Sequence, residues 1–290
     1  MSTTAFIGLG VMGYPMAGHL RSAGHDVTVF NRTASRAASW VAEHGGAAAP
    51  TPAAAAEGSE IVFLCVGADP DVREVTLGSD GVLSTMASGP VLVDHTTASA
   101  DVAREGHGAA AERGVGFVDA PISGGQAGAE NGVLTVMCGG DREPFDRAAP
   151  VIEAYARAVT LMGPSGSGQL TKMVNQICIA GLLQGLSEGI DFAVRAGLDV
   201  ERLVDVISKG AAGSWQMENR ATTMAAGQFD FGFALDWMRK DLGICLAEAD
   251  RLGASLEVTR LVDGYYAELQ AAGHGRWDSS ALIARLSDRA

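Results

Sequence analysis

The stretch Phe6-Ile7-Gly8-Leu9-Gly10-Val11-Met12-Gly13 decides the fold of this chain. Its glycines have the spacing G-x-G-x-x-G and stand between a short apolar segment and a helical one, within a unit of about 30 residues. Gly8 allows a tight turn, Gly10 lets a pyrophosphate approach the backbone, and Gly13 lets the helix pack closely on the strand. The alternative is an ordinary glycine-rich turn. The strand-and-helix context favours a dinucleotide site at residues 8–13, where the helix N-terminus attracts phosphate charge.

Short apolar segments alternate with segments of helical periodicity through the first half of the chain. The expected strands are 5–7, 27–30, 61–66, 91–93, 116–118, 134–137 and 159–161, and helices at 12–23, 35–44 and 100–113 lie among them. Strands that alternate with helices form βαβ units and a mainly parallel sheet. The first half is therefore predicted to be an α/β domain of the Rossmann type.

A cluster of helix and strand breakers, Gly163-Pro164-Ser165-Gly166-Ser167-Gly168, ends the last of these strands. Beyond it the strand signals fade, and helices are expected at 169–196, 200–209, 235–252 and 258–272. We therefore expect a dinucleotide-binding domain over residues 1–164 and an all-helical domain for substrate binding and oligomerisation over residues 165–290. The helix at 169–196 is too apolar for one small domain to cover, and exposed apolar patches mark interfaces. A homodimer or homotetramer is expected.

Composition argues against several classes of partner. The formal net charge is −13, whereas a nucleic-acid surface needs a basic patch. The start of the chain lacks the features of a signal peptide, and the apolar run 177–186 is shorter than the about 20 residues that a membrane span needs. The four cysteines form no C-x-x-C pair and the histidines are scattered, so no metal site is expected. We expect a cytoplasmic protein without nucleic-acid or membrane partners.

The residues after the second expected strand indicate which cofactor binds. NAD enzymes place an acidic residue there, about 20 residues after the glycine motif, to bind the ribose 2′-hydroxyl. This chain has Asn31-Arg32-Thr33 instead. Arg32 can pair with a 2′-phosphate and lie against the adenine, and Asn31 and Thr33 supply neutral donors. A solvated surface arginine is the alternative. The pattern favours NADP, with NAD possible.

Three further segments carry candidate chemistry. Asp119-Ala120-Pro121-Ile122-Ser123-Gly124-Gly125 follows a strand, and its serine and glycines offer a hydroxyl and open N–H groups for a carboxylate, although a plain turn explains them equally well. Lys172 and Asn175 are three residues apart and share one face of an apolar helix just after the breaker cluster. Arg239-Lys240-Asp241 lies near the start of a later helix and by itself is a typical charged turn.

Together these segments resemble the β-hydroxyacid dehydrogenase family, which includes 3-hydroxyisobutyrate dehydrogenase and several semialdehyde reductases and is related to 6-phosphogluconate dehydrogenase. The resemblance covers essentially the whole chain. It rests on F-I-G-L-G-V-M-G at 6–13, D-A-P-I-S-G-G at 119–125, G-S-G-Q-L-T-K-M-V-N at 166–175, and K-D at 240–241. It implies reversible hydride transfer between NADP and a small β-hydroxy acid or its semialdehyde.

The resemblance also implies a role for each matching residue. Lys172 would be the general acid/base, and Asn175 would orient the substrate hydroxyl or carbonyl. The substrate carboxylate would be held by Ser123, Gly124 and Gly125, and Phe231 would close the site. Further cofactor contacts would come from Val66, Gly67, Thr97 and Lys240.

Two departures from the family pattern and two rival functions remain. The family usually reads D-x-S-T where this chain has Asp94-His95-Thr96-Thr97, and Trp215 places an indole where a substrate wall is expected, which leaves the substrate open. One rival is an imine reductase, built on a similar two-domain plan. The other is a non-enzymatic NADP-binding protein. Imine reductases generally lack the catalytic lysine and a degenerate protein would be expected to lose it, so Lys172 argues against both.

Overall fold

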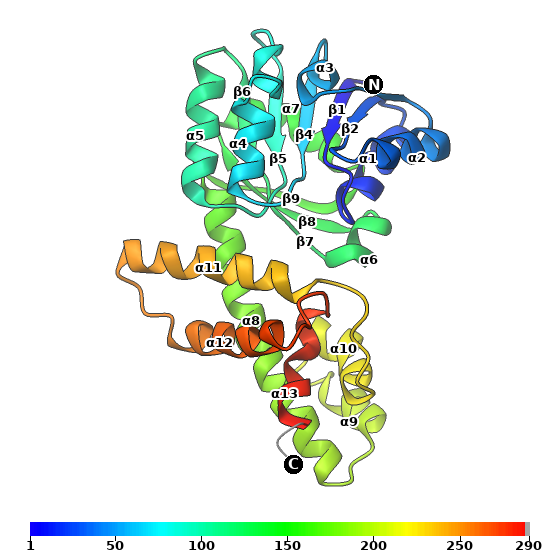
Figure 1. Cartoon of the computed structure of the whole chain (residues 1–290), viewed down its shortest axis with the longest axis vertical. Helices are drawn as coiled ribbons and strands as arrows, with labels where there is room; N and C mark the ends of the chain where they lie inside the picture. Colours follow the sequence, from blue (N-terminus) through cyan, green and yellow to red (C-terminus); the bar gives the residue numbers. More distant parts are fainter. Residues whose placement is uncertain (288–290) are drawn as a thin grey trace. The chain divides into compact units, whose positions relative to one another are not determined.

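The computed structural model describes residues 1–287 and divides into two compact units, Met1–Lys172 and the described residues from Met173 onward (Figure 1). The division falls inside one helix, α8 (Ser167–Arg195). The sequence analysis placed the boundary earlier, at residue 164, in the breaker cluster. The first turn of α8 belongs to the first unit because backbone N–H groups of Gly166 and Gln169 are hydrogen-bonded to Asp119.

The first unit is built on one sheet with the order β3-β2-β1-β4-β5-β6-β8-β7, in which β9 pairs with β8. The strands are β1 (Thr3–Ile7), β2 (Asp26–Phe30), β3 (Ala47–Ala48), β4 (Ile61–Leu64), β5 (Val91–Asp94), β6 (Gly116–Asp119), β7 (Ile122–Ser123), β8 (Leu134–Gly140) and β9 (Ala156–Gly163). The first six strands of this order pair in parallel, and β8 runs antiparallel to β6. The order from β3 to β6 is that of a Rossmann dinucleotide-binding sheet, so the predicted fold class is confirmed.

Helices cover both faces of this sheet, which is why central strands such as β4 and β5 are apolar runs rather than alternating ones. The helices are α1 (Gly13–Ser22), α2 (Ala34–His44), α3 (Pro52–Ala56), α4 (Asp69–Leu77), α5 (Ala100–Ala111), α6 (Gly125–Glu130) and α7 (Arg142–Ile152). Successive residues of β1 show the two faces. Phe6 packs in the core under α1, α2 and α7, whereas Ala5 and Ile7 pack in the core under α3 and α5.

The second unit is helical, as predicted. It contains the rest of α8, then α9 (Val200–Ile207), α10 (Trp215–Ala225), α11 (Leu235–Leu252), α12 (Glu257–Ala271) and α13 (Ala284–Ser287). By length and composition α8 is apolar enough to cross a membrane. It also supplies Leu183, Leu186 and Ile190 to the core of this unit, and the core helix of a soluble protein meets the same criterion.

Candidate active site

The glycine-rich turn between β1 and α1 has the shape that a dinucleotide needs. Gly8 has a φ of +97°, and a Cβ there would collide with the carbonyl oxygen of Cys65. A Cβ on Gly13 would collide with the carbonyl oxygen of Gly8, whereas Gly10 has open space on its side-chain face. Gly8 and Gly13 therefore allow the backbone to fold, and Gly10 leaves room for a ligand. The residues present fit the pyrophosphate of a dinucleotide.

Asn31 ties this turn to the end of β2. Its Oδ1 accepts a hydrogen bond from the Leu9 N–H at 2.9 Å, and its Nδ2 donates to the Thr33 carbonyl at 3.1 Å. Sequence analysis assigned Asn31 as a donor to the cofactor. In the structure its amide bonds the backbone on both sides, so it shapes the site as well as lining it.

Arg32 is 89% exposed, and its Nη1 lies 3.5 Å from Asp71 Oδ1. The sequence analysis found no acidic residue at the end of β2 to repel a 2′-phosphate. The structure corrects that picture, because Asp71 on α4 brings a carboxylate to the same place. The other oxygen of Asp71 accepts the Ala68 N–H at 3.1 Å, which caps α4 and holds the carboxylate there.

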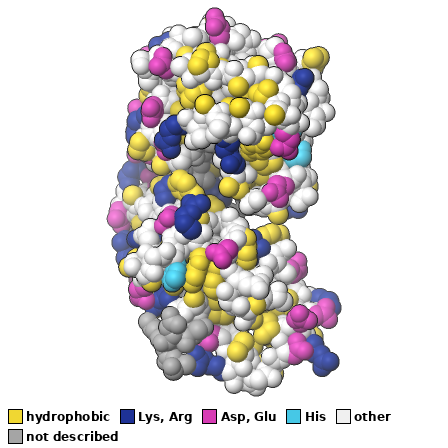
Figure 2. Space-filling model, turned by 45° about the vertical axis from the view of Figure 1, so that its right-hand side comes forward, with side chains coloured by type: hydrophobic (Ala, Val, Ile, Leu, Met, Phe, Trp, Pro, Cys, Tyr) yellow, Lys and Arg dark blue, Asp and Glu magenta, His cyan; other side chains and the backbone are white. Residues whose placement is uncertain are grey.

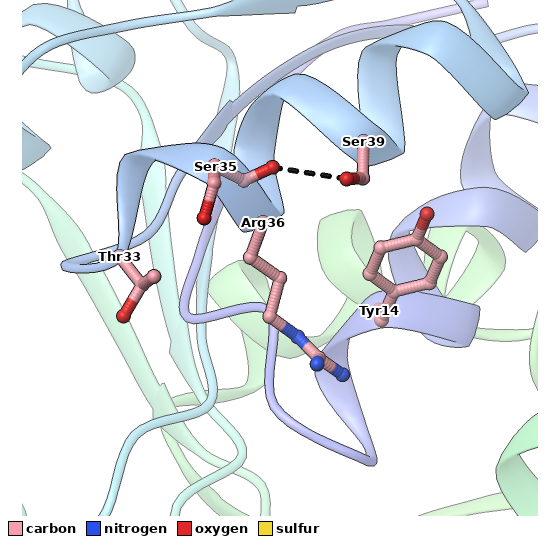
Figure 3. Close-up of a pocket in the computed structure, with 5 residues that line it drawn as sticks. All are labelled: Tyr14, Thr33, Ser35, Arg36 and Ser39. Atoms are coloured by element: carbon pink, nitrogen blue, oxygen red, sulfur yellow. Dashed lines mark hydrogen bonds between the residues drawn. The ribbon is translucent and has the colours of Figure 1, made fainter.

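A second arginine, Arg36, which the sequence analysis did not identify, lies beside the glycine-rich turn between β1 and α1 (Figure 3). Arg36 extends from α2 over the ring of Tyr14, with its guanidinium carbon 5.4 Å from the ring centroid, and its Nε donates to the Leu9 carbonyl. A cavity of about 460 Å³ surrounds it, lined by Tyr14, Thr33, Ser35, Arg36 and Ser39. The sequence signal that could have revealed it is the spacing R-x-x-x-R where α2 begins.

The segments that follow β4 and β5 are joined at the carboxyl edge of the sheet. The Val66 N–H donates to the Thr96 hydroxyl at 3.0 Å, and the Thr96 N–H donates to Asp94 Oδ1 at 2.9 Å. This arrangement places the predicted cofactor residues Val66, Gly67 and Thr97 on two adjoining loops.

His95 has a structural environment. Its ring nitrogens lie 2.7 Å from the Ala120 carbonyl and 2.8 Å from the Tyr155 hydroxyl, and its ring stacks on Phe63. Burial lowers the pKa of His95 to about 4, so the imidazole is neutral near pH 7. We assign it to the core rather than to proton transfer.

The predicted carboxylate cradle follows β6. Ser123 is in the short strand β7, and Gly124 and Gly125 have φ values of +136° and +62°. Positive φ values favour glycine, and a Cβ on Gly125 would meet no atom within 4 Å. The backbone here is open enough to receive a small anionic group.

Lys172 is 7% exposed and lies on the first turns of α8. Two buried side chains hold this part of the helix. Asp119 at the end of β6 accepts the Gly166 N–H at 2.7 Å and the Gln169 N–H at 3.0 Å. Gln169 itself donates from Nε2 to the Thr96 carbonyl at 2.7 Å and accepts the Ala98 N–H on Oε1 at 3.0 Å. Sequence analysis identified the lysine but neither of these partners.

The candidate residues of the second unit fall into two groups. In the first, Asn175 donates to Gln176 at 2.8 Å, Gln176 donates to Asp241 at 2.7 Å, and Lys240 Nζ lies 3.1 Å from Asp241. The predicted K-D pair is thus part of a network that starts at Asn175.

The second group surrounds the Arg220 guanidinium. Its carbon is 4.8 Å from the Trp215 ring centroid and 4.9 Å from that of Phe231, and its Nε is 3.4 Å from Asp278. The structure thereby brings together the two aromatic residues that the sequence analysis had considered separately.

The predicted residues of the first unit lie on the loops and helix starts at the carboxyl ends of β1, β2, β4, β5 and β6. Ligands of open α/β sheets bind outside these ends. Within residues 1–287, no group of three or more histidine, cysteine or acidic side chains could hold a metal ion. A Rossmann sheet, its glycine-rich turn and a nearby buried lysine define the class of nicotinamide-dinucleotide oxidoreductases.

Comparison with known protein families divides the chain in the same way. Residues 3–163 match the family described as the NAD binding domain of 6-phosphogluconate dehydrogenase. Residues 166–286 match the family described as NAD-binding of NADP-dependent 3-hydroxyisobutyrate dehydrogenase.

Curated relatives match over almost their whole length. An uncharacterized oxidoreductase of Shewanella frigidimarina is 62% identical over 99% of this chain and 98% of its own. The 3-hydroxyisobutyrate dehydrogenase of Pseudomonas aeruginosa is 36% identical over 88% of each chain. An NAD-dependent L-serine dehydrogenase of the same species is 34% identical over 97% of each chain.

Solved structures agree. A Mycobacterium tuberculosis 3-hydroxyisobutyrate dehydrogenase with L-serine has a TM-score of 0.88 and 33% identity, over 99% of each chain. Psf3, in complex with NADP+ and 2-OPP, has a TM-score of 0.89 and 25% identity, over 98% of this chain and 99% of its own. An imine reductase from Pseudomonas sp., 21% identical over 98% of this chain and 99% of its own with a TM-score of 0.65, shares the fold alone.

The chain therefore belongs to the β-hydroxyacid dehydrogenase family. It is an NAD(P)-dependent oxidoreductase that acts on hydroxyl groups.

Proposed function

We propose that the protein interconverts a small β-hydroxy acid and its semialdehyde, with NADP as the cofactor and Lys172 as the general acid/base. The observation that carries the proposal is the buried position of Lys172 on the first turns of α8. That part of the helix is bonded to the segments after β5 and β6, where a Rossmann domain binds its ligand.

In the reductive direction, Lys172 Nζ donates a proton to the carbonyl oxygen while the carbonyl carbon gains a hydride. In the oxidative direction the same nitrogen accepts the hydroxyl proton. The nicotinamide, when bound, supplies or takes up the hydride. Asn175 follows Lys172 by one helical turn and would orient the reacting oxygen. Ser123, Gly124 and Gly125 would hold the substrate carboxylate, which places the reacting carbon and lowers the entropy cost of reaction.

The substrate class is supported by the relatives. Two of them are named for 3-hydroxyisobutyrate and L-serine, both small hydroxy acids. Phe231 would close the site and Lys240 would contact the cofactor, as the family resemblance implies. The Arg220 guanidinium carbon lies 4.8 Å from the Trp215 ring centroid and 4.9 Å from that of Phe231, so a wall made of these rings would favour a small substrate.

The NADP preference rests on the charges beside the adenosine end of the site. Arg32 and Arg36 both lie there, and β2 does not end in an acidic residue. The description of the family that matches residues 166–286 names an NADP-dependent enzyme, and one solved neighbour holds NADP+. One relative, however, is named as NAD-dependent. Asp71 opposes the preference by pairing with Arg32.

The test is a turnover assay of purified protein with small semialdehydes and NADPH, and with 3-hydroxyisobutyrate and L-serine in the oxidative direction. Lys172→Ala is expected to lower kcat by about 10²–10⁴-fold, which is the usual contribution of a general acid. NADPH binding, followed by cofactor fluorescence, should change little. Lys172→Arg should fail as well, because a guanidinium stays protonated.

Lys209→Ala is the matched control, since Lys209 is exposed and pairs with Asp205 at 2.7 Å. It should keep full activity. If Lys172→Ala keeps more than a tenth of the normal kcat, the proton comes from another group and the proposal is wrong. Reduction of cyclic imines in place of semialdehydes would favour the imine-reductase alternative.

A further inference from the structure

We propose that Gln169 is a positioning residue, which holds Lys172 at a set place relative to the loop that carries Thr97. Gln169 is 1% exposed, and its carboxamide bonds the backbone on both sides of Thr97. Nε2 donates to the carbonyl of Thr96 at 2.7 Å, and Oε1 accepts the N–H of Ala98 at 3.0 Å. The inference rests on the proposed role of Lys172 in proton transfer.

The main chain of Gln169 is held as firmly as its side chain. Its N–H donates to Asp119 Oδ2 at 3.0 Å, while Oδ1 of the same carboxylate accepts the Gly166 N–H at 2.7 Å. A Cβ on Gly168 would collide with the carbonyl oxygens of Met137 and Asp119. The first turn of α8 is therefore pressed against the sheet and cannot rotate about its axis without breaking these bonds.

Lys172 follows Gln169 by three residues on the same helix. Residues with this spacing share a helix face and are separated by about 4.5 Å along the axis. Any shift of the turn that contains Gln169 therefore moves the base of the lysine side chain by a similar amount. A misplacement of about 1 Å can cost about 10²-fold in rate. The Gln169 carboxamide thus links the segment proposed to lie beside the nicotinamide with the helix that carries the acid/base.

Other side chains would not make this link. Glutamate has the same length, but it would set a carboxylate oxygen against the Thr96 carbonyl in place of a donor. Methionine is similar in length but would leave the Thr96 carbonyl and the Ala98 N–H buried without partners, which is unfavourable because neither group regains the hydrogen bond that it makes with water. Asparagine is one methylene too short to reach both.

The test uses the full-length enzyme and the variants Gln169→Glu and Gln169→Met. We expect kcat to fall 10- to 100-fold in both, with the Kd for NADPH within twofold of the wild-type value. The primary isotope effect with NADPH deuterated at the transferred position should change, because misplaced reactants alter the transfer step itself. Thr171→Val is the matched control. Its hydroxyl donates to the Ser167 carbonyl of the same helix at 2.7 Å, and kcat should stay within twofold.

Each result decides something. If both Gln169 variants keep kcat within threefold while Lys172→Ala loses 100-fold or more, the positioning inference is wrong and the proposed function stands. If Lys172→Ala remains active, the proposed function fails and the inference fails with it. A fall in kcat that matches a loss of NADPH-binding sites, with an unchanged isotope effect, shows only a loss of folded protein and overturns the inference. In the double variant Lys172→Ala/Gln169→Glu, the second change should lower kcat no further.

Discussion

At the scale of single residues, two buried carboxyl groups at the ends of neighbouring strands have unequal surroundings. Asp119 accepts two backbone N–H groups. Asp94 accepts the Thr96 N–H with one oxygen, and within the described residues its other oxygen has no hydrogen-bond partner. Burial raises the pKa of Asp94 to about 7 and that of Asp119 to about 6. A negative charge is therefore less stable on Asp94 than on Asp119.

The raised pKa of Asp94 predicts a pH-dependent stability difference. Between the ordinary value of 3.8 and about 7, the folded state keeps a proton that the unfolded state has lost, so rising pH destabilises the fold. Asp94→Asn removes this loss. The Tm of the variant minus that of the wild type should rise from pH 4 to pH 7 and then level off. The corresponding difference in the free energy of unfolding has an upper bound of about 4 kcal/mol, at about 1.4 kcal/mol per pKa unit.

The matched control is Asp146→Asn, which replaces an exposed carboxylate on α7 that pairs with Arg142. Its Tm difference should be nearly flat over the same range. A flat difference for Asp94→Asn would contradict the assignment of Asp94 as a carboxyl group that is protonated near neutral pH.

The charges around Arg32 predict the cofactor preference and how to change it. NADPH should give a higher kcat/KM than NADH. Arg32→Ala should remove most of that ratio, because a charged hydrogen bond to phosphate contributes about 1.5–3 kcal/mol. Asp71→Asn should increase the ratio, since it removes the carboxylate 3.5 Å from Arg32. Steady-state kinetics with NADPH and NADH measure the ratio of the two kcat/KM values. Arg104→Ala on α5 is the control and should leave this ratio unchanged. Equal efficiency with both cofactors in the wild type would refute the preference.

Sequence analysis could propose roles for residues that lie in a motif of their own, but it could not find contacts between distant segments. Gly8, Gly13 and Lys172 were singled out locally, and the role of Lys172 remains a prediction. Arg32 and Asp71 are 39 residues apart, and Gln169 and Thr96 are 73 apart, so neither contact leaves a local pattern. The composition could also have drawn attention to Lys172. The chain has only three lysines, Lys172, Lys209 and Lys240, against 18 arginines.

At the scale of elements, the strands were predictable because each contains a short apolar run, and strands such as β4 and β5 are buried on both faces. All seven expected strands are present within a few residues of the expected bounds. The strands β3 and β7 were missed because each has two residues, too few for any periodicity. The helix α6 was missed because its sequence, GQAGAE, contains two glycines, which are poor helix formers.

The packing of α8 against the sheet predicts opposite effects for two glycine substitutions. Gly168→Ala should lower the free energy of unfolding by about 1–3 kcal/mol, the usual cost of overpacking, because the added methyl group would meet the backbone oxygens of Met137 and Asp119. Gly243→Ala on α11 should be neutral or should stabilise by up to about 1 kcal/mol, since nothing lies within 4 Å of its Cβ. Urea or thermal denaturation compares the two. Equal changes would show that the start of α8 is not tightly packed.

At the scale of the whole molecule, hydrophobic side chains lie among the charged ones on the visible surface of the protein (Figure 2). One apolar groove of about 430 Å³ is lined by α8, α9 and α10. Phe192 on α8 borders this groove and is 71% exposed. Such exposed apolar area is typical of an interface. The expected homodimer or homotetramer, like the cytoplasmic location, remains a prediction.

Light scattering at micromolar concentration tests the assembly. We expect a mass of two or four times the 29.8 kDa of one chain. Phe192→Asp should shift the mass toward that of one chain, because moving a charge from water into an apolar contact is unfavourable. Leu77→Asp, at an exposed apolar residue of α4, is the control and should leave the mass unchanged. A wild-type mass of 29.8 kDa would show that the protein is a monomer.

The two units divide directly after Lys172. This division indicates where chimeras of this protein and its relatives should be joined. A crossover in the breaker cluster at residues 163–168 would transfer Lys172 and Gln169 with the helical half. It would separate them from their own Asp119 and Thr96. A crossover after Lys172 would transfer the lysine together with the sheet that holds it. Chimeras joined after Lys172 should inherit the proposed acid/base and its support as one block. Their helical halves could then be exchanged to test whether that half selects the substrate, while Lys172 stays in place.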